Sequence, residues 1–409
     1  MASDKREGNN LFAALQYKNF RRYWLGMCVS VIGTWMQNIA QPWLAYTLTD
    51  SPLLLSLVSM AQFIPVLLFS LPAGVIIDKF PKKLIIMLTQ SASLAITLLL
   101  GVLVWSERIR YWHILVLALL LGMVNTLDMP ARHAFVPQLT EKKSLMNAIA
   151  LNSISFNLGR IVGPGIAGLV MGSFGIAMCF FINAVSYAMV LVSLFTIKTW
   201  TPETIPGIRE AKLLTQVEDG LNYIRQNREL LQILLLVASV TIFAGNNSVL
   251  VPVYTKKILG LGETYFGVIM SLMGGGSFLG AMCIAGLSKI GPRKKAVTVT
   301  PYLIALSIGV TGLTGHYALT GLTLAMSGFF FILFSSNANT MIQLKVEDVY
   351  RGRVMSVYNL VFGGTLPIGN MIAGLVVDRC NARAGFYVCG ISIAVLSMLL
   401  TGLYHRLHL

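Results

Sequence analysis

Long apolar runs alternate with short polar segments along almost the whole chain. The runs reach the roughly 20 residues that a helix needs to cross about 30 Å of hydrocarbon. A backbone inside a bilayer has no water to bond, so these runs are expected to be helices and not open sheets. The pattern predicts twelve spanning helices, at residues 20–48, 52–77, 84–105, 111–135, 144–171, 174–197, 231–255, 262–287, 296–315, 318–342, 350–377 and 384–404.

The second half of the chain repeats the first at the sequence level. Residues 138–170 begin with Gln-Leu and end in Ile-Ala-Gly-Leu-Val, and residues 343–376 begin and end in the same way. A duplication that divides a very apolar chain is typical of transporters built from two pseudo-symmetric bundles. The expected fold is therefore an all-α integral membrane protein with two six-helix bundles, at residues 1–200 and 230–409.

A cytoplasmic linker, residues 201–229, is expected to join the two bundles. Within it Leu214, Val217, Leu221 and Ile224 recur at helical spacing, while charged residues occupy the opposite face. This pattern predicts an amphipathic helix on the cytoplasmic surface that acts as a tether.

The composition excludes a soluble globule, and the distribution of Lys and Arg along the chain explains the excess of basic residues. Hydrophobic residues make up 56% of the chain, charged residues 11%, and the net charge is +15. Of the 31 Lys and Arg residues, 24 fall in segments assigned to the inside and 6 in outer loops. This distribution follows the positive-inside rule with both termini cytoplasmic, so the charge indicates topology and no nucleic-acid partner is expected.

No feature of the sequence points to catalysis. It contains no Walker motif, zinc-ligand spacing or nucleophile elbow, and its 5 cysteines are scattered. The Gly274–Ser277 run lies inside a predicted helix without a lysine, which favours helix packing over nucleotide binding. We expect no enzyme activity, no cofactor and no metal. We expect a monomer in the plasma membrane, the inner membrane of a bacterium, whose partners are the lipid bilayer and a small-molecule substrate.

The segment after the second predicted helix has the composition of a gate. It reads Gly74-Val-Ile-Ile-Asp78-Lys79-Phe-Pro-Lys82-Lys83 and resembles the signature loop of the major facilitator superfamily, although proline stands where a glycine is usual. Gly74 would allow a close helix approach, and Asp78 could accept from N–H groups at a helix N-terminus. The resemblance implies the twelve-helix fold, alternating access, and a pairing of Lys82 with Asp128. The gating set is Gly74, Asp78, Lys79, Lys82, Lys83, Asp128 and Arg132.

The fifth predicted helix carries a run of small residues around a proline. Residues 159–168 read Gly-Arg-Ile-Val-Gly-Pro-Gly-Ile-Ala-Gly and resemble the antiporter motif of drug exporters in the same superfamily, with alanine in place of one glycine. A Gly-Pro pair bends a helix, and small residues would let the other half of the molecule pack closely. The resemblance implies export by proton antiport, with a proton gradient as driving force. The motif residues are Gly159, Arg160, Gly163, Pro164 and Gly168.

Two further stretches narrow the resemblance to one branch. Residues 125–137, followed by 147–153, and residues 351–356 are similar to the branch that includes the enterobactin exporter and the macrolide efflux proteins. This similarity implies kinship and leaves the substrate open.

Arg160 is a charged residue inside a spanning segment, which costs a few kcal/mol or more. It is expected to contact an anion in a cavity, to pair with a carboxylate during the cycle, or to brace carbonyls freed at Pro164. Asp78, Asp128 and Asp378 all fall toward helix ends, so no carboxylate is obvious near the midplane. Proton coupling is therefore implied by the resemblance alone.

Amides on the predicted helices, with rings such as Trp35, Phe156 and Phe243, indicate a cavity for an uncharged or amphipathic compound. The candidate substrate-binding residues are Gln37, Asn38, Gln41, Asn125, Asn152, Asn157, Arg160, Asn246, Asn247, Asn337 and Asn359.

The sequence predicts a secondary transporter that exports a small amphipathic molecule, such as a drug, siderophore or metabolite. One alternative is a lipid or lysolipid transporter whose cavity opens sideways to the bilayer. Another is a non-transporting scaffold or receptor with this fold, although a scaffold has no need of the gate loop.

Overall fold

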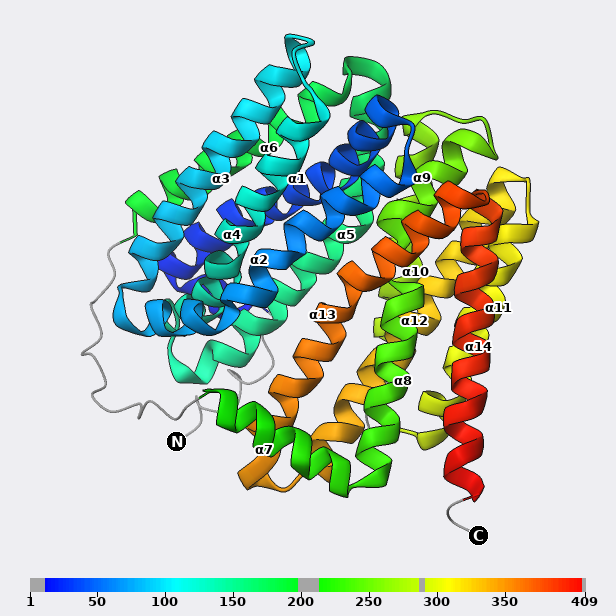
Figure 1. Ribbon diagram of the computed structural model, residues 1–409. Helices are drawn as coiled ribbons and strands as arrows, with labels where there is room; N and C mark the ends of the chain where they lie inside the picture. The colour runs from blue at the N-terminus through cyan, green and yellow to red at the C-terminus, as the bar shows by residue number, and fades with distance from the viewer. Residues whose placement is uncertain (1–11, 198–212, 287–290, 407–409) are drawn as a thin grey trace. The chain divides into compact units, whose positions relative to one another are not determined.

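The computed structural model describes residues 12–197, 213–286 and 291–406, and all regular structure in these residues is helical (Figure 1). The first helices are α1 (Lys18–Thr49), α2 (Pro52–Lys79), α3 (Lys82–Trp105), α4 (Tyr111–Phe135), α5 (Leu145–Phe174) and α6 (Ile176–Phe195). The later ones are α7 (Leu213–Gln226), α8 (Arg228–Ala244), α9 (Asn247–Lys257), α10 (Glu263–Gly286), α11 (Lys294–Leu313), α12 (Tyr317–Lys345), α13 (Asp348–Arg379) and α14 (Ala382–Arg406).

The observed helices match the predicted ones closely, with one break that was not predicted. The span expected at residues 231–255 is divided into α8 and α9 at Gly245 and Asn246. A Cβ built at Gly245 would clash with Leu366 Cδ2 of α13, and one built at Gly369 would clash with the carbonyl oxygen of Ile242. The segment around the break therefore packs against α13 more closely than side chains larger than that of glycine at positions 245 and 369 would allow.

Eleven segments of the described chain are long and apolar enough to cross a membrane, with α8 and α9 counted together. Helix α1 has 32 residues and is also long enough to span, but Gln37, Asn38 and Gln41 lower the hydropathy of its middle. The predicted all-helical membrane fold is confirmed, and eleven of the twelve predicted spans meet the apolar criterion.

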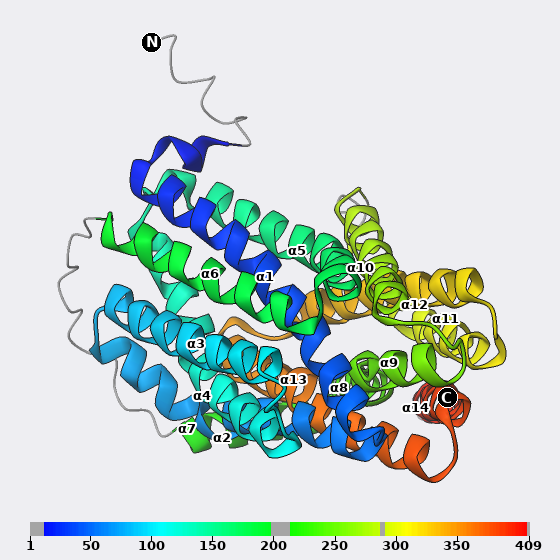
Figure 2. The same cartoon turned by 90° about the horizontal axis from the view of Figure 1, so that it is seen from above.

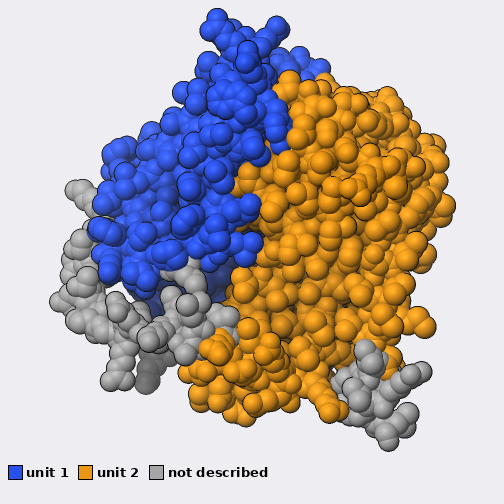
Figure 3. Space-filling view, viewed as in Figure 1, with its two compact units in different colours: residues 1–40, 64–206 blue, residues 41–63, 207–409 orange. Residues whose placement is uncertain are grey.

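The helices form two compact units (Figure 3). Of the described residues, unit 1 comprises 12–40 and 64–197, and unit 2 comprises 41–63, 213–286 and 291–406. These units differ from the two predicted bundles, because residues 41–63 of α1 and α2 pack with the later part of the chain. Helix α1 thus begins in unit 1 and ends in unit 2, and α2 begins in unit 2 and ends in unit 1.

Unit 1 has an aromatic core near the first residues of α1. Phe20, Tyr23 and Phe135 are almost fully buried, and the rings of Tyr23 and Phe135 meet edge to face at 5.4 Å. Lys83, in the first turn of α3, donates from Nζ to the carbonyl of Ile197 at 2.7 Å. A cation at the carbonyl end of a helix is favourable, so this contact ties α3 to the end of α6.

Unit 2 uses glycine for close helix packing. A Cβ at Gly276 of α10 would clash with the carbonyl oxygen of Ala325 in α12, and one at Gly280 would lie 2.7 Å from that of Phe329. The glycine run of α10 is therefore a packing surface, as its place inside a helix predicted.

The helix expected in the linker is present as α7, and it docks on the start of α13. Asp219 pairs with Arg353 at 3.1 Å, and the rings of Tyr223 and Tyr350 stack at 4.4 Å. A Cβ at Gly220 would lie 2.9 Å from Arg353 O, so the two backbones approach closely. This docking fixes α7 within unit 2.

Candidate functional site

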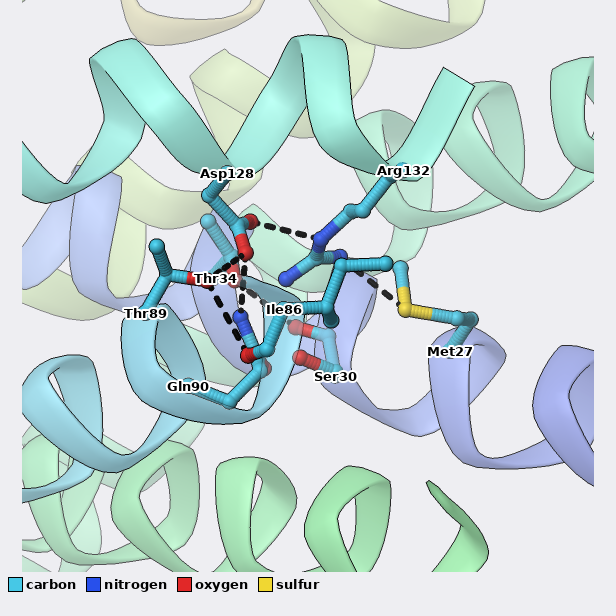
Figure 4. Close-up of polar contacts among 8 residues, drawn as sticks. All are labelled: Met27, Ser30, Thr34, Ile86, Thr89, Gln90, Asp128 and Arg132. Atoms are coloured by element: carbon cyan, nitrogen blue, oxygen red, sulfur yellow. Dashed lines mark hydrogen bonds and ion pairs between the residues drawn. The ribbon is translucent and has the colours of Figure 1, made fainter. Parts of the chain in front are cut away.

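A buried ionic network connects three helices of unit 1 (Figure 4). The Asp128 side chain is 6% exposed and lies on α4. Its Oδ1 accepts hydrogen bonds from Thr89 Oγ1 at 2.6 Å and Gln90 Nε2 at 3.0 Å, both on α3. Its Oδ2 lies 2.6 Å from Nε of Arg132, one turn later on α4, and Arg132 Nη1 donates to Met27 Sδ of α1 at 3.0 Å. The carboxylate is therefore surrounded by donors inside the protein.

The spacing of this pair explains how the network forms. Residues four apart on a helix lie on the same face, so Asp128 and Arg132 meet without any help from tertiary structure. A buried ion pair is tolerated when its remaining hydrogen-bonding capacity is satisfied, and Thr89 and Gln90 supply donors for the second carboxylate oxygen. The network fixes α4 against α3 and α1.

The predicted pairing of Lys82 with Asp128 is wrong. Lys82 is half-buried at the start of α3, and its Nζ donates to the carbonyls of Asp78 at 3.3 Å and Phe80 at 3.5 Å. Thr89, which contacts Asp128, lies seven residues further along α3, or roughly 10 Å along the helix axis. Arg132, which is in the predicted gating set, pairs with the buried carboxylate, and its gating role stays a prediction.

The remaining gate residues lie at the exposed end of α2. Asp78 and Lys79 are exposed, and Asp78 is contacted through its backbone carbonyl. The close helix approach expected at Gly74 is not observed, because a Cβ built there would meet no atom within 4 Å. A gating role for these residues stays a prediction.

The small residues of α5 pack against α1, which runs beside it in both views (Figures 1 and 2). A Cβ at Gly159 would lie 2.6 Å from Val31 Cγ1, and one at Gly163 would lie 2.5 Å from Trp35 Cβ. Pro164 and Gly168 are buried. The motif was expected to pack against the other half of the molecule, but its close partner is a helix of the same unit. The two helix backbones approach because glycine has no side chain.

Arg160 follows Gly159 of the α1–α5 contact, and its side chain has few hydrogen-bond partners. Its Nη2 donates to Asn157 Oδ1 at 2.9 Å, and Asn157 Nδ2 donates to the carbonyl of Ser153 at 2.8 Å. The Nε atom of Arg160 is shielded from solvent and has no hydrogen-bond partner. Pro164 frees the carbonyl of Arg160 itself, which its own guanidinium does not contact. The expected bracing of freed carbonyls is therefore not what the structure shows.

An aromatic pair includes Phe156, which lies one helical turn before Arg160 on α5. The rings of Trp35 and Phe156 meet edge to face at 5.6 Å, and Phe156 is 45% exposed. Arg160 lies four residues after Phe156 and three after Asn157, so the ring and the amide both come from the turn before the cation on α5.

Gln37 is an interhelical residue. It is 4% exposed, and its Oε1 accepts from Thr97 Oγ1 at 3.1 Å and from Asn183 Nδ2 at 2.6 Å. These bonds join α1, α3 and α6. The structure gives Gln37 an interhelical role, and its predicted substrate-binding role stays a prediction.

The two asparagines at the break between α8 and α9 are likewise engaged by the protein. Asn246 is 1% exposed and donates to the carbonyl of Phe243 at 3.4 Å and to Cys389 Sγ at 3.6 Å. Asn247 donates to the carbonyl of Ala244 at 3.1 Å. Both amides bond backbone groups that the break leaves without helical partners.

The other predicted amides divide into engaged and accessible groups. Asn337 accepts from the backbone of Arg293 at 3.2 Å, which positions the start of α11, and donates to Leu333 O at 2.8 Å. Gln41 is buried, and its Nε2 has no partner within the described structure. The accessible or half-buried amides are Asn38, Asn125, Asn152 and Asn359.

Unit 2 contains a charged cluster that the sequence analysis missed. Asp50, in the turn between α1 and α2, lies 3.2 Å from Lys257 Nζ and 3.6 Å from Lys256 Nζ. Ser51 Oγ donates to Asp378 Oδ1 at 3.2 Å. Desolvation opposes ionisation of Asp50, but the pairs with Lys257 and Lys256 outweigh it and lower the pKa of Asp50. Two consecutive lysines at a predicted outer end were the available signal, because outer loops carry few basic residues.

Comparison with known proteins bears on what this arrangement does. Residues 9–408 match the family described as transmembrane secretion effector. The staphyloferrin A transporter of Staphylococcus aureus is 24% identical over 383 residues, covering 92% of this chain and 94% of the relative. Macrolide efflux protein A of Streptococcus pyogenes is 21% identical over 389 residues, covering 93% and 94%. The crystal structure of the nucleoside transporter NupG shares the fold, with a TM-score of 0.76 and 12% identity over 94% of this chain and 99% of that one.

Proposed function

Because the chain belongs to the transmembrane secretion effector family, a branch of the major facilitator superfamily, we propose that it exports a small amphipathic molecule by proton antiport. The family match over residues 9–408 carries the proposal. Membership of the superfamily and transport in place of catalysis were both predicted from the sequence and are confirmed. Under the proposal, the protein lies in the bacterial inner membrane with both termini inside.

The relatives support a small molecule as cargo and outward movement as its direction. One relative is named for staphyloferrin A and another for macrolide efflux. The accessible amides and the Trp35–Phe156 ring pair offer hydrogen bonds and flat apolar surface, which an amphipathic compound requires. Proton antiport is the coupling implied by the resemblance of the α5 motif to that of drug exporters.

Everted membrane vesicles test the direction and the coupling together. In such vesicles an exporter loads its substrate inward while protons leave. Accumulation of erythromycin, fluorescein and rhodamine 6G should be measured with an imposed pH gradient and after a protonophore has removed it. Accumulation that exceeds that of vesicles lacking the protein, and that requires the gradient, is the expected result.

Two outcomes would contradict the proposal in different ways. Accumulation that is indifferent to the gradient removes proton antiport, and no accumulation of any probe removes export of such molecules. Asp78→Asn should impair transport without impairing expression, since it removes the single carboxylate of the gate segment, residues 74–83. Glu107→Gln, the same change in the exposed turn after α3, is the matched control and should transport normally.

A further inference from the structure

We infer that the exported molecule carries an anionic group and that Arg160 binds it. The inference rests on the proposed function, because it specifies the chemical class of the proposed cargo. It narrows the sequence expectation of an uncharged or amphipathic compound to an amphipathic anion.

The position of Arg160 makes its charge costly. It lies fifteen residues after the start of α5, roughly 22 Å along the axis of a helix of 30 residues. This is the middle of a segment long enough to cross the membrane. A charged side chain at the centre of a spanning helix costs about 2.5–3.5 kcal/mol on insertion scales, and it is normally compensated by an opposite charge or by water.

Comparison with Arg132 shows what compensation looks like in this protein. Arg132 has the Asp128 carboxylate 2.6 Å from its Nε. Arg160 has no carboxylate of the described residues within ion-pair distance. Of the five N–H groups of its guanidinium, one is bonded to Asn157, and the shielded Nε–H has no acceptor. The protein therefore leaves a cation and most of its donors to a partner that is not part of the described chain.

The free donors of Arg160 suit an anion that is planar or forked. A guanidinium presents paired N–H groups that match the two oxygens of a carboxylate, which a lysine cannot reproduce. Asn157 is held by the Ser153 carbonyl and therefore steadies the guanidinium through its own side-chain oxygen. The fork is thus positioned before a ligand binds, which reduces the entropy that binding costs.

The ring pair of Trp35 and Phe156, with Phe156 one helical turn before Arg160 on α5, supplies the apolar part of the proposed site. Trp35 and Phe156 meet at 5.6 Å, and Phe156 remains 45% exposed. A ligand with its anionic group on Arg160 could lay an apolar ring or chain against Phe156. The site therefore fits an organic anion better than a small inorganic one.

Two dyes with the same three-ring core and opposite charge test the inference. Fluorescein is anionic and rhodamine 6G is cationic, and binding of each to the purified protein is measured by fluorescence polarisation. The wild type should prefer fluorescein. Arg160→Gln should weaken fluorescein binding about tenfold or more and leave rhodamine 6G within about twofold, since a charge-assisted contact is lost for the anion alone. Arg108→Gln, the same change in the exposed turn after α3, is the matched control and should change neither.

Several outcomes would overturn the inference. They are equal binding of both dyes by the wild type, binding of neither, and equal weakening of both by Arg160→Gln. If Arg160→Gln does not fold, Arg160→Lys takes its place, and it should bind fluorescein between the wild type and background. Anion-selective binding that depends on Arg160, without gradient-driven accumulation of fluorescein in vesicles, would contradict the proposed antiport and support the inference. Gradient-driven accumulation of rhodamine 6G, without accumulation of fluorescein, would support the proposed antiport and contradict the inference.

Discussion

Removal of the Asp128 charge should destabilise unit 1 strongly. Asp128→Asn keeps the shape of the side chain but leaves the Arg132 guanidinium without its counter-charge. The Arg132 side chain is 15% exposed, so water cannot replace the lost carboxylate. The new amide also presents two N–H groups where Thr89, Gln90 and Arg132 already donate, and at least one of these donors loses its acceptor.

The size of the effect follows from burial. Breaking a buried ion pair by removing one partner typically costs about 3–5 kcal/mol, because the other charge stays buried and unpaired. An exposed pair contributes up to about 1 kcal/mol. Glu141 and Lys143 form such a pair at 3.5 Å with both side chains more than half exposed. Glu141→Gln is therefore a matched control with the same chemistry and little expected cost.

Thermal unfolding of the purified protein in detergent measures both variants. Asp128→Asn should lower the melting temperature by several degrees, and Glu141→Gln should change it little. The double change Asp128→Asn with Arg132→Met should recover much of the loss, since an unpaired buried charge is removed. Lys82→Ala should add to Asp128→Asn without coupling, because the two side chains do not meet. A melting temperature for Asp128→Asn within about 1 °C of the wild type would refute this account of the network.

Two further predictions follow from packing and charge. Gly163→Ala should destabilise by about 1–3 kcal/mol, because its Cβ would lie 2.5 Å from Trp35 Cβ. Gly74→Ala meets open space inside α2 and should be neutral or stabilising by up to about 1 kcal/mol, so equal melting temperatures would contradict the α1–α5 contact. Asp50→Asn should lower stability slightly at pH 7 through loss of the Lys257 pair. The lowered pKa of Asp50 means that this contribution is complete above the unfolded pKa of about 3.9 and is lost as the pH falls through the lower folded value, so a difference in melting temperature that does not shrink as the pH is lowered below the unfolded pKa would contradict it.

The helices could be predicted from the sequence because their signal is local. Twenty apolar residues in a row identify a span wherever it packs, and the predicted ends lie within a few residues of those observed. The break at Gly245 and Asn246 had a local signal too, since glycine followed by asparagine is typical of turns. The surrounding apolar residues concealed it, because they satisfy the length rule across the break.

The polar contacts were harder to predict because most of them join distant parts of the chain. The pairing of Asp128 with Arg132 was visible in their spacing of four residues, whereas Thr89 and Gln90 come from another helix. Gln37 and Asn38 look alike in sequence. Gln37 is hydrogen-bonded to side chains of two other helices, whereas Asn38 is exposed. That difference depends on how the helices are rotated about their axes.

Helices α1 and α2 are each divided between the two units, and each contains a proline close to the division. α1 passes from unit 1 to unit 2 after Ala40, and α2 passes back after Phe63. Pro42 and Pro65 each lie within two residues of those points. A proline removes one helical hydrogen bond and crowds the preceding turn, so a helix bends there more easily than elsewhere. Each of the two helices therefore carries a proline, and with it a point of easier bending, close to where it passes from one unit to the other.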